Sequence, residues 1–206
     1  TVNVTSQTLD PVINCPNCSD VDTPRPDFVT VDTNSYSLPI NGISGAERLI
    51  KNILINEPCV QLSNFEASAP VSFGYFNRNN SVFPFKEGII IRSGIAEATQ
   101  GKYDGTFNGT IGSGIGDADL NIILAAQGFS TNTLDASFVR FDFVPTVEDF
   151  KVNFVYTSNE YGQYRCDNPG TGVVDAFAFI LTNLNTGAVQ NLAVVPGTTT
   201  LVAVPN

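Results

Sequence analysis

The chain has 206 residues, with 20 acidic and 10 basic side chains and a formal net charge of −10. This length suits one large β domain or one domain with an extension. The negative charge argues against nucleic acid as a partner, because phosphate binding needs a positive surface. It suits a secreted protein or one that binds cations. No run of 18 or more apolar residues occurs, so we expect no direct membrane span.

Three residue types are missing, namely His, Met and Trp. Without His, the usual imidazole base for a Ser or Cys nucleophile is absent, and zinc sites built on His are excluded. Because Met is missing, we expect Thr1 to follow a processing event or a deliberate truncation. Trp is the commonest sugar-stacking residue, and its absence argues against a glycan-active enzyme. We therefore expect a protein that is not an enzyme.

Four cysteines, Cys15, Cys18, Cys59 and Cys166, occur in the chain. A C-x-x-C redox motif usually lies at the start of a helix in a βαβ unit, and the C-P-N-C pair has no such pattern nearby. The other two cysteines are too far apart in sequence to favour a four-cysteine zinc site. Disulfides are the preferred interpretation, and they imply an oxidising, extracytoplasmic setting. Of the three connectivities we favour Cys15–Cys18 with Cys59–Cys166.

The first 43 residues are rich in Thr, Asp, Asn, Pro and Ser, which predicts an irregular N-terminal extension with one or two edge strands. Its extended pieces are expected at 28–31 and 36–38. Residues 44–55 are the only predicted helix. Ser44 and Glu47 form a capping box there, and apolar residues then recur at helical spacing up to Leu54.

Strand patterns dominate after residue 58. Aromatic and aliphatic residues alternate with polar ones over 71–75, 139–143 and 150–156, which is typical of half-buried strands. More continuous apolar runs occupy 89–91, 122–124 and 177–181, as in central strands. Because helices do not alternate with strands, a parallel sheet is disfavoured. The pattern predicts an all-β fold, an antiparallel β-sandwich with one short N-terminal helix.

Two carboxylates, Glu160 and Asp175, lie next to segments that are predicted to be buried strands. Asp175 shares its predicted strand face with Phe177, and a bare carboxylate there would be costly to bury. Asp175 either caps a turn at the exposed mouth of the strand, or it converges with Glu160 and Asn159 on a cation. Carboxylate and amide oxygens suit Ca²⁺. A glycosidase pair made of the two acids is a third interpretation, and a weaker one.

A second cation site is suggested by Asp117, Asp119 and Asn121, which would share one face of an extended chain. The glycines that precede them would let the backbone bend close to an ion. The spacing fits neither an EF-hand nor a dinucleotide-binding fingerprint. A flexible turn with solvated aspartates explains the stretch equally well.

Several stretches resemble, in order, the choice-of-anchor L domain of secreted surface proteins of Bacteroidota. The most specific part is "SNEYGQY" followed by "VVDAFAFIL". The other matching stretches are "AERLIKNILINEPCVQLSNFEAS", "GYFNRNNSVFPFKEGIIIRSGIA", "GIGDADLN", "ASFVRFDFVPTVEDFKVNFVYT" and "NLAVVPGTTTLVAV". The likeness covers residues 44–206, and residues 1–43 remain outside it.

The resemblance implies an extracellular, jelly-roll-like module of large cell-surface proteins that act as adhesins or as components of surface structures. It also makes a structural or Ca²⁺-binding role more credible for Asp117, Asp119, Glu160 and Asp175. The alternative is a lectin-like module that binds carbohydrate through Ca²⁺. The expected partners are other surface-protein subunits or glycans.

Similar domains continue beyond "VPGTTTLVAV", whereas this sequence ends at Asn206. We therefore expect either a truncated sheet or an unpaired edge. An unpaired edge would accept a strand from another copy and so build a homopolymeric filament.

Overall fold

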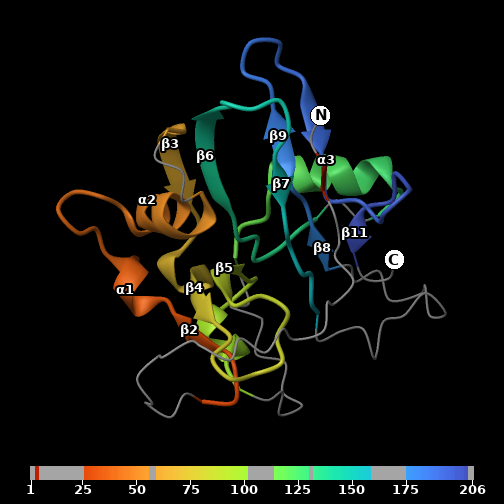
Figure 1. The fold of residues 1–206 in the computed structure, drawn as a ribbon. Helices are drawn as coiled ribbons and strands as arrows, with labels where there is room; N and C mark the ends of the chain where they lie inside the picture. Colours follow the sequence, from red (N-terminus) through yellow and green to blue (C-terminus); the bar gives the residue numbers. More distant parts are fainter. Residues whose placement is uncertain are drawn as a thin grey trace. The chain divides into compact units, whose positions relative to one another are not determined.

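The computed structural model describes residues 3–4, 26–55, 59–101, 114–129, 132–158 and 175–203 (Figure 1). In the described part of the chain more residues lie in strands than in helices, and the strands form several small sheets. The chain divides into two compact units. The first unit comprises Leu9–Gly114 and Asp135–Thr146; the second comprises Thr1–Thr8, Ile115–Leu134 and Val147–Asn206.

The first unit contains a three-stranded antiparallel sheet and a separate antiparallel pair. The sheet has the order β2–β4–β5, with Val31 opposite Phe76 and Phe73 opposite Ile91. Its strands are β2 (Thr30–Asp32), β4 (Phe73–Asn77) and β5 (Glu87–Ile91); the pair consists of β3 (Gln61–Ala67) and β6 (Val139–Val144). These strands confirm the edge strand expected near residue 30 and the strand patterns over 89–91 and 139–143. The pattern over 71–75 is confirmed only from Phe73 onward, because Val71 and Ser72 belong to a short 3₁₀ helix.

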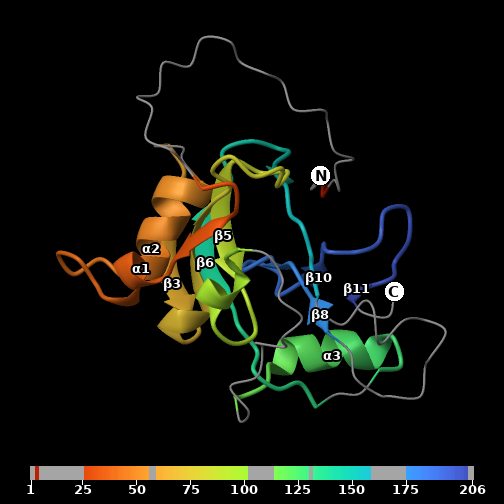
Figure 2. The ribbon, with the colours of Figure 1, turned by 90° about the horizontal axis from the view of Figure 1, so that it is seen from below.

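Strand β4 is buried on both of its faces. Phe73 packs in one cluster with Ala46 and Leu49, and Figure 2 shows the helix that carries them beside the strands of the first unit. Phe76 packs in a second cluster with Val31 and residues of the following loop. Fully burying a Phe or Leu side chain stabilises a fold by roughly 1.5–3 kcal/mol, so these residues fix β4 at the centre of the unit.

The predicted helix is confirmed, although its second half has another geometry. Helix α2 (Gly45–Leu49) begins after Ser44, whose hydroxyl accepts a hydrogen bond from the Glu47 amide at 3.1 Å. The Glu47 carboxylate accepts from Lys51 Nζ at 2.7 Å. The chain continues as a π-helix, η1 (Ile50–Leu54). The cap and the following apolar residues together explain the helix.

The prediction of an extended piece at 36–38 is wrong, because residues Asn34–Ser37 form a short helix, α1. The Asp32 carboxylate accepts a hydrogen bond from the Ser35 amide at 2.9 Å and so begins the turn. Two short 3₁₀ helices complete the described part of the first unit: η2 (Pro70–Ser72) and η3 (Ala96–Thr99).

The second unit is built around helix α3 (Ala118–Ala126) and short strand pairs. Leu124 of this helix is buried with Leu201 and Ala203. The antiparallel pairs are β8 (Ala176–Phe177) with β11 (Val202–Ala203) and β9 (Ile180–Thr182) with β10 (Val189–Asn191); β1 (Asn3–Val4) pairs in parallel with β7 (Lys151–Val152).

Two predictions for this unit need correction. The apolar run 122–124 lies in α3 and is not a strand, because Asp117 caps a helix there. The run 177–181 is divided between β8 and β9. The predicted two-layer sandwich is not confirmed either, since each described sheet has only two or three strands.

Candidate functional site

The predicted cation face at Asp117, Asp119 and Asn121 does not form in the way the sequence suggested. Asp117 is the N-cap of α3, and its carboxylate accepts a hydrogen bond from the Leu120 amide at 2.8 Å. Asp119 lies in the first helical turn. Residues two positions apart on a helix point in different directions, whereas on a strand they share a face. The prediction that these three residues share one face of an extended chain is therefore wrong.

The polar atoms beside this cap hold the loop that follows α3. The Asp117 amide donates to the Thr133 hydroxyl at 2.9 Å, and the Thr133 amide donates to Asn121 Oδ1 at 3.0 Å. Asp117 and Asn121 thus have structural roles, since they fix the start of α3 against residues 132–134.

Asp175 lies next to an aromatic cluster in the second unit. Its carboxylate accepts a hydrogen bond from the Ser158 hydroxyl at 2.6 Å, and the residue is half-buried. The Phe177 ring lies 5.2 Å from that of Phe154 and 6.5 Å from that of Tyr156. Ser158 therefore supplies part of the hydrogen bonding that a partly buried carboxylate needs.

The other predicted calcium ligands, Asn159 and Glu160, lie outside the described residues. Within the ranges that the structure describes, no group of three or more His, Cys, Asp or Glu side chains could hold a metal ion. Of the cysteines, Cys59 carries a free, exposed thiol, so the predicted bond between Cys59 and Cys166 is not observed. Cys15, Cys18 and Cys166 lie outside the described residues.

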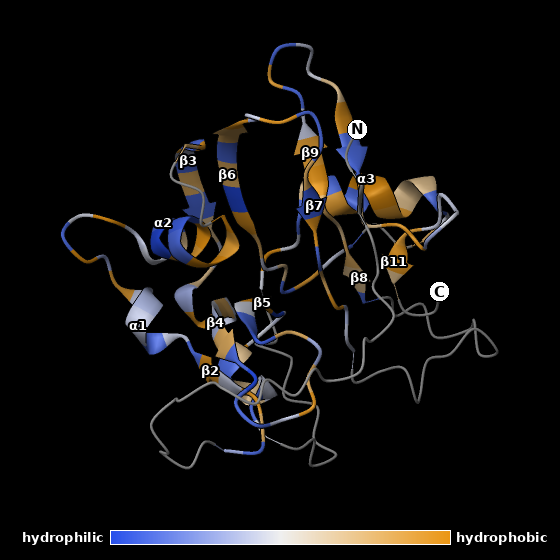
Figure 3. Cartoon of the chain, viewed as in Figure 1, coloured by the Kyte–Doolittle hydropathy of each residue, from blue (hydrophilic) through white to orange (hydrophobic). Residues whose placement is uncertain are grey.

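The sequence analysis missed an exposed apolar loop between α1 and α2, which we call the aliphatic loop (residues 38–43). Leu38, Ile40 and Ile43 are 72%, 51% and 41% exposed. Figure 1 shows the loop projecting from the first unit, and Figure 3 shows hydrophobic colouring along its arms. Three large aliphatic side chains on one short projection are typical of a contact surface.

A tight two-residue turn shapes this loop. Ile40 and Ile43 exchange two backbone hydrogen bonds, each 3.0 Å long, and the turn residues Asn41 and Gly42 have φ angles of 53° and 80°. Positive φ at both turn residues is the hairpin geometry that Asn-Gly favours. The signal that could have found it is an Asn-Gly pair between two isoleucines.

The base of the aliphatic loop is fixed by Arg48. Its Nη2 atom donates to the carbonyl oxygens of Ser35 at 2.6 Å and Leu38 at 3.0 Å, and its guanidinium lies 5.0 Å from the centre of the Tyr36 ring. Burial, and then the Asp32 carboxylate, raise the pKa of Tyr36, so the phenol stays neutral beside these groups. Arg48 therefore ties the base of the loop to helix α2 through side-chain contacts.

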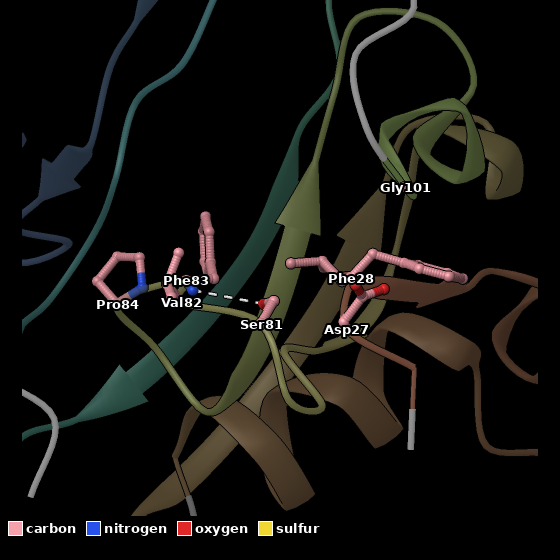
Figure 4. Close-up of a pocket in the computed structure, with 8 residues that line it drawn as sticks. Asp27, Phe28, Ser81, Val82, Phe83, Pro84 and Gly101 are labelled. Carbon is pink, nitrogen blue, oxygen red and sulfur yellow. Dashed lines mark hydrogen bonds between the residues drawn. The ribbon is translucent and has the colours of Figure 1, made fainter. Parts of the chain in front are cut away.

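A shallow apolar groove of about 340 Å³ also lies on the first unit. Figure 4 shows its two walls, one formed by Asp27 and Phe28 and the other by residues 81–84. Val82 is 90% exposed, so nearly its whole side chain is in contact with solvent. The lining residues are Asp27, Phe28, Val29, Ser81, Val82, Phe83, Pro84 and Gly101.

The second unit has a groove of about 360 Å³ with a different chemistry. Its polar side chains are the amides of Gln127, Gln190 and Asn191 and the hydroxyls of Thr198 and Thr199, and none of the described residues that line it is charged. Such a lining suits a neutral ligand that donates and accepts hydrogen bonds.

The described residues thus form small sheets with an exposed aliphatic loop and two surface grooves. The chain belongs to the Choice-of-anchor L domain family, whose model matches residues 31–206. This membership makes it a surface-associated module. None of the described helices has the length and apolar character that a bilayer crossing requires. Comparisons with curated proteins and with solved structures gave no match.

Proposed function

We propose that this chain is a non-enzymatic extracellular module that holds surface proteins together or attaches the cell to other surfaces, using the aliphatic loop as its contact. The observation that carries the proposal is the solvent exposure of Leu38 and Ile40 on a loop fixed by Arg48. Keeping such side chains in water is unfavourable, and burying them against a partner recovers about 25 cal/mol per Å² of apolar surface. A preformed loop also loses little entropy on binding.

The test is retention of producing cells on a surface coated with the 206-residue chain. We expect Leu38→Ser to lower the number of retained cells at least about tenfold, because the loop loses its most exposed aliphatic side chain. Leu184→Ser is the matched control, because Leu184 is 71% exposed and lies in the second unit. Equal retention by the wild type and Leu38→Ser would contradict the proposal.

Calcium belongs to this proposal as a stabilising ion. Asp175 supplies one carboxylate, and Asn159 and Glu160 would supply the remaining side-chain oxygens that Ca²⁺ prefers. The ion would order the chain between strands and would take no part in a reaction.

The neutral groove of the second unit supports a second candidate function, carbohydrate binding. Amide and hydroxyl side chains such as Gln190 and Thr199 can pair with sugar hydroxyls. A glycan array read with and without EDTA tests this function. Binding that Gln190→Ala abolishes would support it. Binding to no glycan, with correctly folded protein, would reject it.

A further inference from the structure

The tip of the aliphatic loop, which Figure 1 shows projecting from the first unit, carries an Asn-Gly dipeptide in an open setting. Asn41 and Gly42 are both exposed, and a Cβ atom added at Gly42 would meet no other atom within 4 Å. The turn is closed by the two backbone hydrogen bonds between the flanking residues, Ile40 and Ile43. Within the described part of the chain, neither the Gly42 amide nor the Asn41 side chain has a hydrogen-bond partner. Both groups are therefore open to solvent and to each other.

These two groups are the reactants of an intramolecular cyclisation. The Gly42 nitrogen follows Asn41 directly in the chain, so its attack on the Asn41 side-chain carbonyl carbon, Cγ, closes a five-membered ring. Glycine permits this attack best, because it has no Cβ atom beside the attacking nitrogen and restricts its own backbone least. The nucleophile is the deprotonated amide, so the reaction becomes faster as the pH rises.

We propose that Asn41 is a site of spontaneous deamidation in the folded protein. A bond forms between the Gly42 nitrogen and Asn41 Cγ, the bond between Cγ and Nδ2 breaks, and ammonia leaves with the proton of the Gly42 amide. The product is a cyclic succinimide, which water opens. Cleavage of the bond between nitrogen and Cγ gives aspartate, and cleavage on the side of the backbone carbonyl carbon gives isoaspartate. Water is the only co-reactant, and no electrons are transferred.

The two products have different effects on the loop. Aspartate keeps the turn, because Asp-Gly favours the same hairpin geometry as Asn-Gly. It places a negative charge beside Ile40 and Ile43 in a chain whose formal net charge is already −10. Isoaspartate carries the main chain through Cγ and so lengthens the turn by one backbone atom. This longer turn does not fit between residues that exchange two hydrogen bonds of 3.0 Å.

The deamidation itself does not depend on the proposed function, but its effect on cell retention rests on it. A charge at the tip of the aliphatic loop opposes its burial against a partner, because a charged group is costly to transfer out of water. We therefore expect the conversion to weaken the contact as the protein ages.

Asn185 in the second unit is a matched comparison within the same chain. It is also exposed, but Thr186 follows it. The Thr186 amide donates a hydrogen bond to the Asn183 side-chain oxygen at 3.1 Å, so the nitrogen that would attack Asn185 is engaged. Thr186 also carries a β-branched side chain, which crowds this nitrogen. Asn185 therefore has the exposure of Asn41 without its reactive neighbour.

The test is incubation of the folded 206-residue chain in water labelled with a heavy oxygen isotope, at neutral and at mildly alkaline pH. Peptide mass mapping measures the label and the products at each Asn. We expect conversion at Asn41 to be at least about tenfold faster than at Asn185, a ratio that needs an activation free energy only about 1.4 kcal/mol lower. It should be faster at the higher pH. Asn41→Gly is the control variant, because Gly-Gly keeps the turn type and removes the reacting carbonyl.

The same chain unfolded in urea shows how fast the dipeptide reacts without the turn. Conversion of Asn41 in the folded chain at a rate well above that of Asn185 supports the proposal. Conversion of Asn41 only after unfolding, conversion no faster than at Asn185, or no conversion in either state would overturn it.

The effect on retention is measured separately, with surfaces coated with aged wild type or aged Asn41→Gly. We expect retention to fall with age on the wild type alone. Retention that depends on Leu38 but not on the age of the wild type would leave the proposed function standing and reject this effect of the conversion. Retention that does not depend on Leu38 would reject the proposed function, while the deamidation measured by mass mapping would stand.

Discussion

The Glu97 carboxylate accepts a hydrogen bond from the buried Thr33 hydroxyl at 2.7 Å, and this contact protects an edge of the sheet. The same oxygen accepts from the Thr33 amide at 3.4 Å and from the Asn34 side chain at 3.2 Å. Gln100 accepts from the Val31 amide at 3.2 Å. Because the side chains of Gln100 and Glu97 accept from the outward amides of Val31 and Thr33, this edge is closed to an added strand.

Replacing Glu97 by Ala should destabilise the first unit by about 1–3 kcal/mol, because the buried Thr33 hydroxyl and its amide lose their acceptor. Urea denaturation measures the change. The control is Glu66→Ala, since Glu66 and Arg140 form an exposed pair at 3.5 Å and such pairs contribute between 0 and about 1 kcal/mol. Equal effects of the two substitutions would mean that the hydrogen bonds of Glu97 with Thr33 contribute nothing to stability.

Gly45→Ala should also destabilise the first unit. A Cβ atom at Gly45 would collide with the Tyr36 carbonyl oxygen, which belongs to the backbone and cannot turn away. We expect a loss of about 1–3 kcal/mol, the cost of overpacking, measured by thermal or urea unfolding. Gly42→Ala provides a comparison, because a Cβ atom at Gly42 would meet no neighbouring atom. Its only expected cost in stability comes from the positive φ angle of 80°. A neutral Gly45→Ala would show that α1 and α2 are not held together as described.

Asp117→Ala should cost about 1 kcal/mol, the usual effect of losing an N-cap. The cost should be the same in Ca²⁺ and in EDTA, because the carboxylate bonds to the Leu120 amide. Asp117→Ser, which keeps a capping oxygen, should restore most of the stability. A cost that appears only in Ca²⁺ would instead make Asp117 a metal ligand.

The start of α2 was predictable because its signals are local. Ser44 and Glu47 are three residues apart, and their cap depends on no distant contact. Helix α3 was missed because the run at 122–124 has the composition of a central strand. The cap at Asp117 and the glycine at 128, which has a φ of 79°, mark both ends of that helix and are the better signals.

The arrangement of the sheets and of the contact surfaces could not be predicted in the same way. Period-two alternation identifies a strand such as β6 but not its neighbour, since pairing with β3 joins residues far apart in sequence. The apolar groove likewise combines Phe28 with Val82, which only the pairing of β2 with β4 brings together. The aliphatic loop differs, because its Asn41-Gly42 turn was visible in the sequence.

Alkaline unfolding should depend on Tyr75. Burial, and then the hydrogen bond to Glu87, raise the pKa of this phenol above its ordinary value of about 10. Its phenol donates to Glu87 Oε2 at 2.6 Å, and the neutral form is the one that the fold favours. The contribution of Tyr75 to stability is therefore complete below about pH 10 and is lost as the pH rises through the folded-state pKa.

Urea midpoints measured between about pH 8 and pH 11.5 test this dependence on Tyr75. Tyr75→Phe should lower stability at pH 8 by about 1 kcal/mol, through the lost hydrogen bond, and should reduce the further loss at alkaline pH. Part of that loss should persist, because the pKa of Tyr36 is raised as well. An alkaline loss that is unchanged in Tyr75→Phe would remove Tyr75 as its source.

Calcium should raise the melting temperature if Asp175 is one of its ligands. At a hundredfold excess over the dissociation constant, a bound ion stabilises by about 2.7 kcal/mol. For a chain of this length that corresponds to roughly 5–10 °C. Asp175→Asn should remove most of this shift, since it discards the charge. Ser158→Ala should keep the shift, because it leaves the charge of the Asp175 carboxylate in place. Melting curves with Ca²⁺, Mg²⁺ or EDTA measure it. Identical curves in Ca²⁺ and EDTA would mean that Asp175 binds no calcium. Its role would then be structural, through the hydrogen bond with Ser158 beside the aromatic cluster around Phe177.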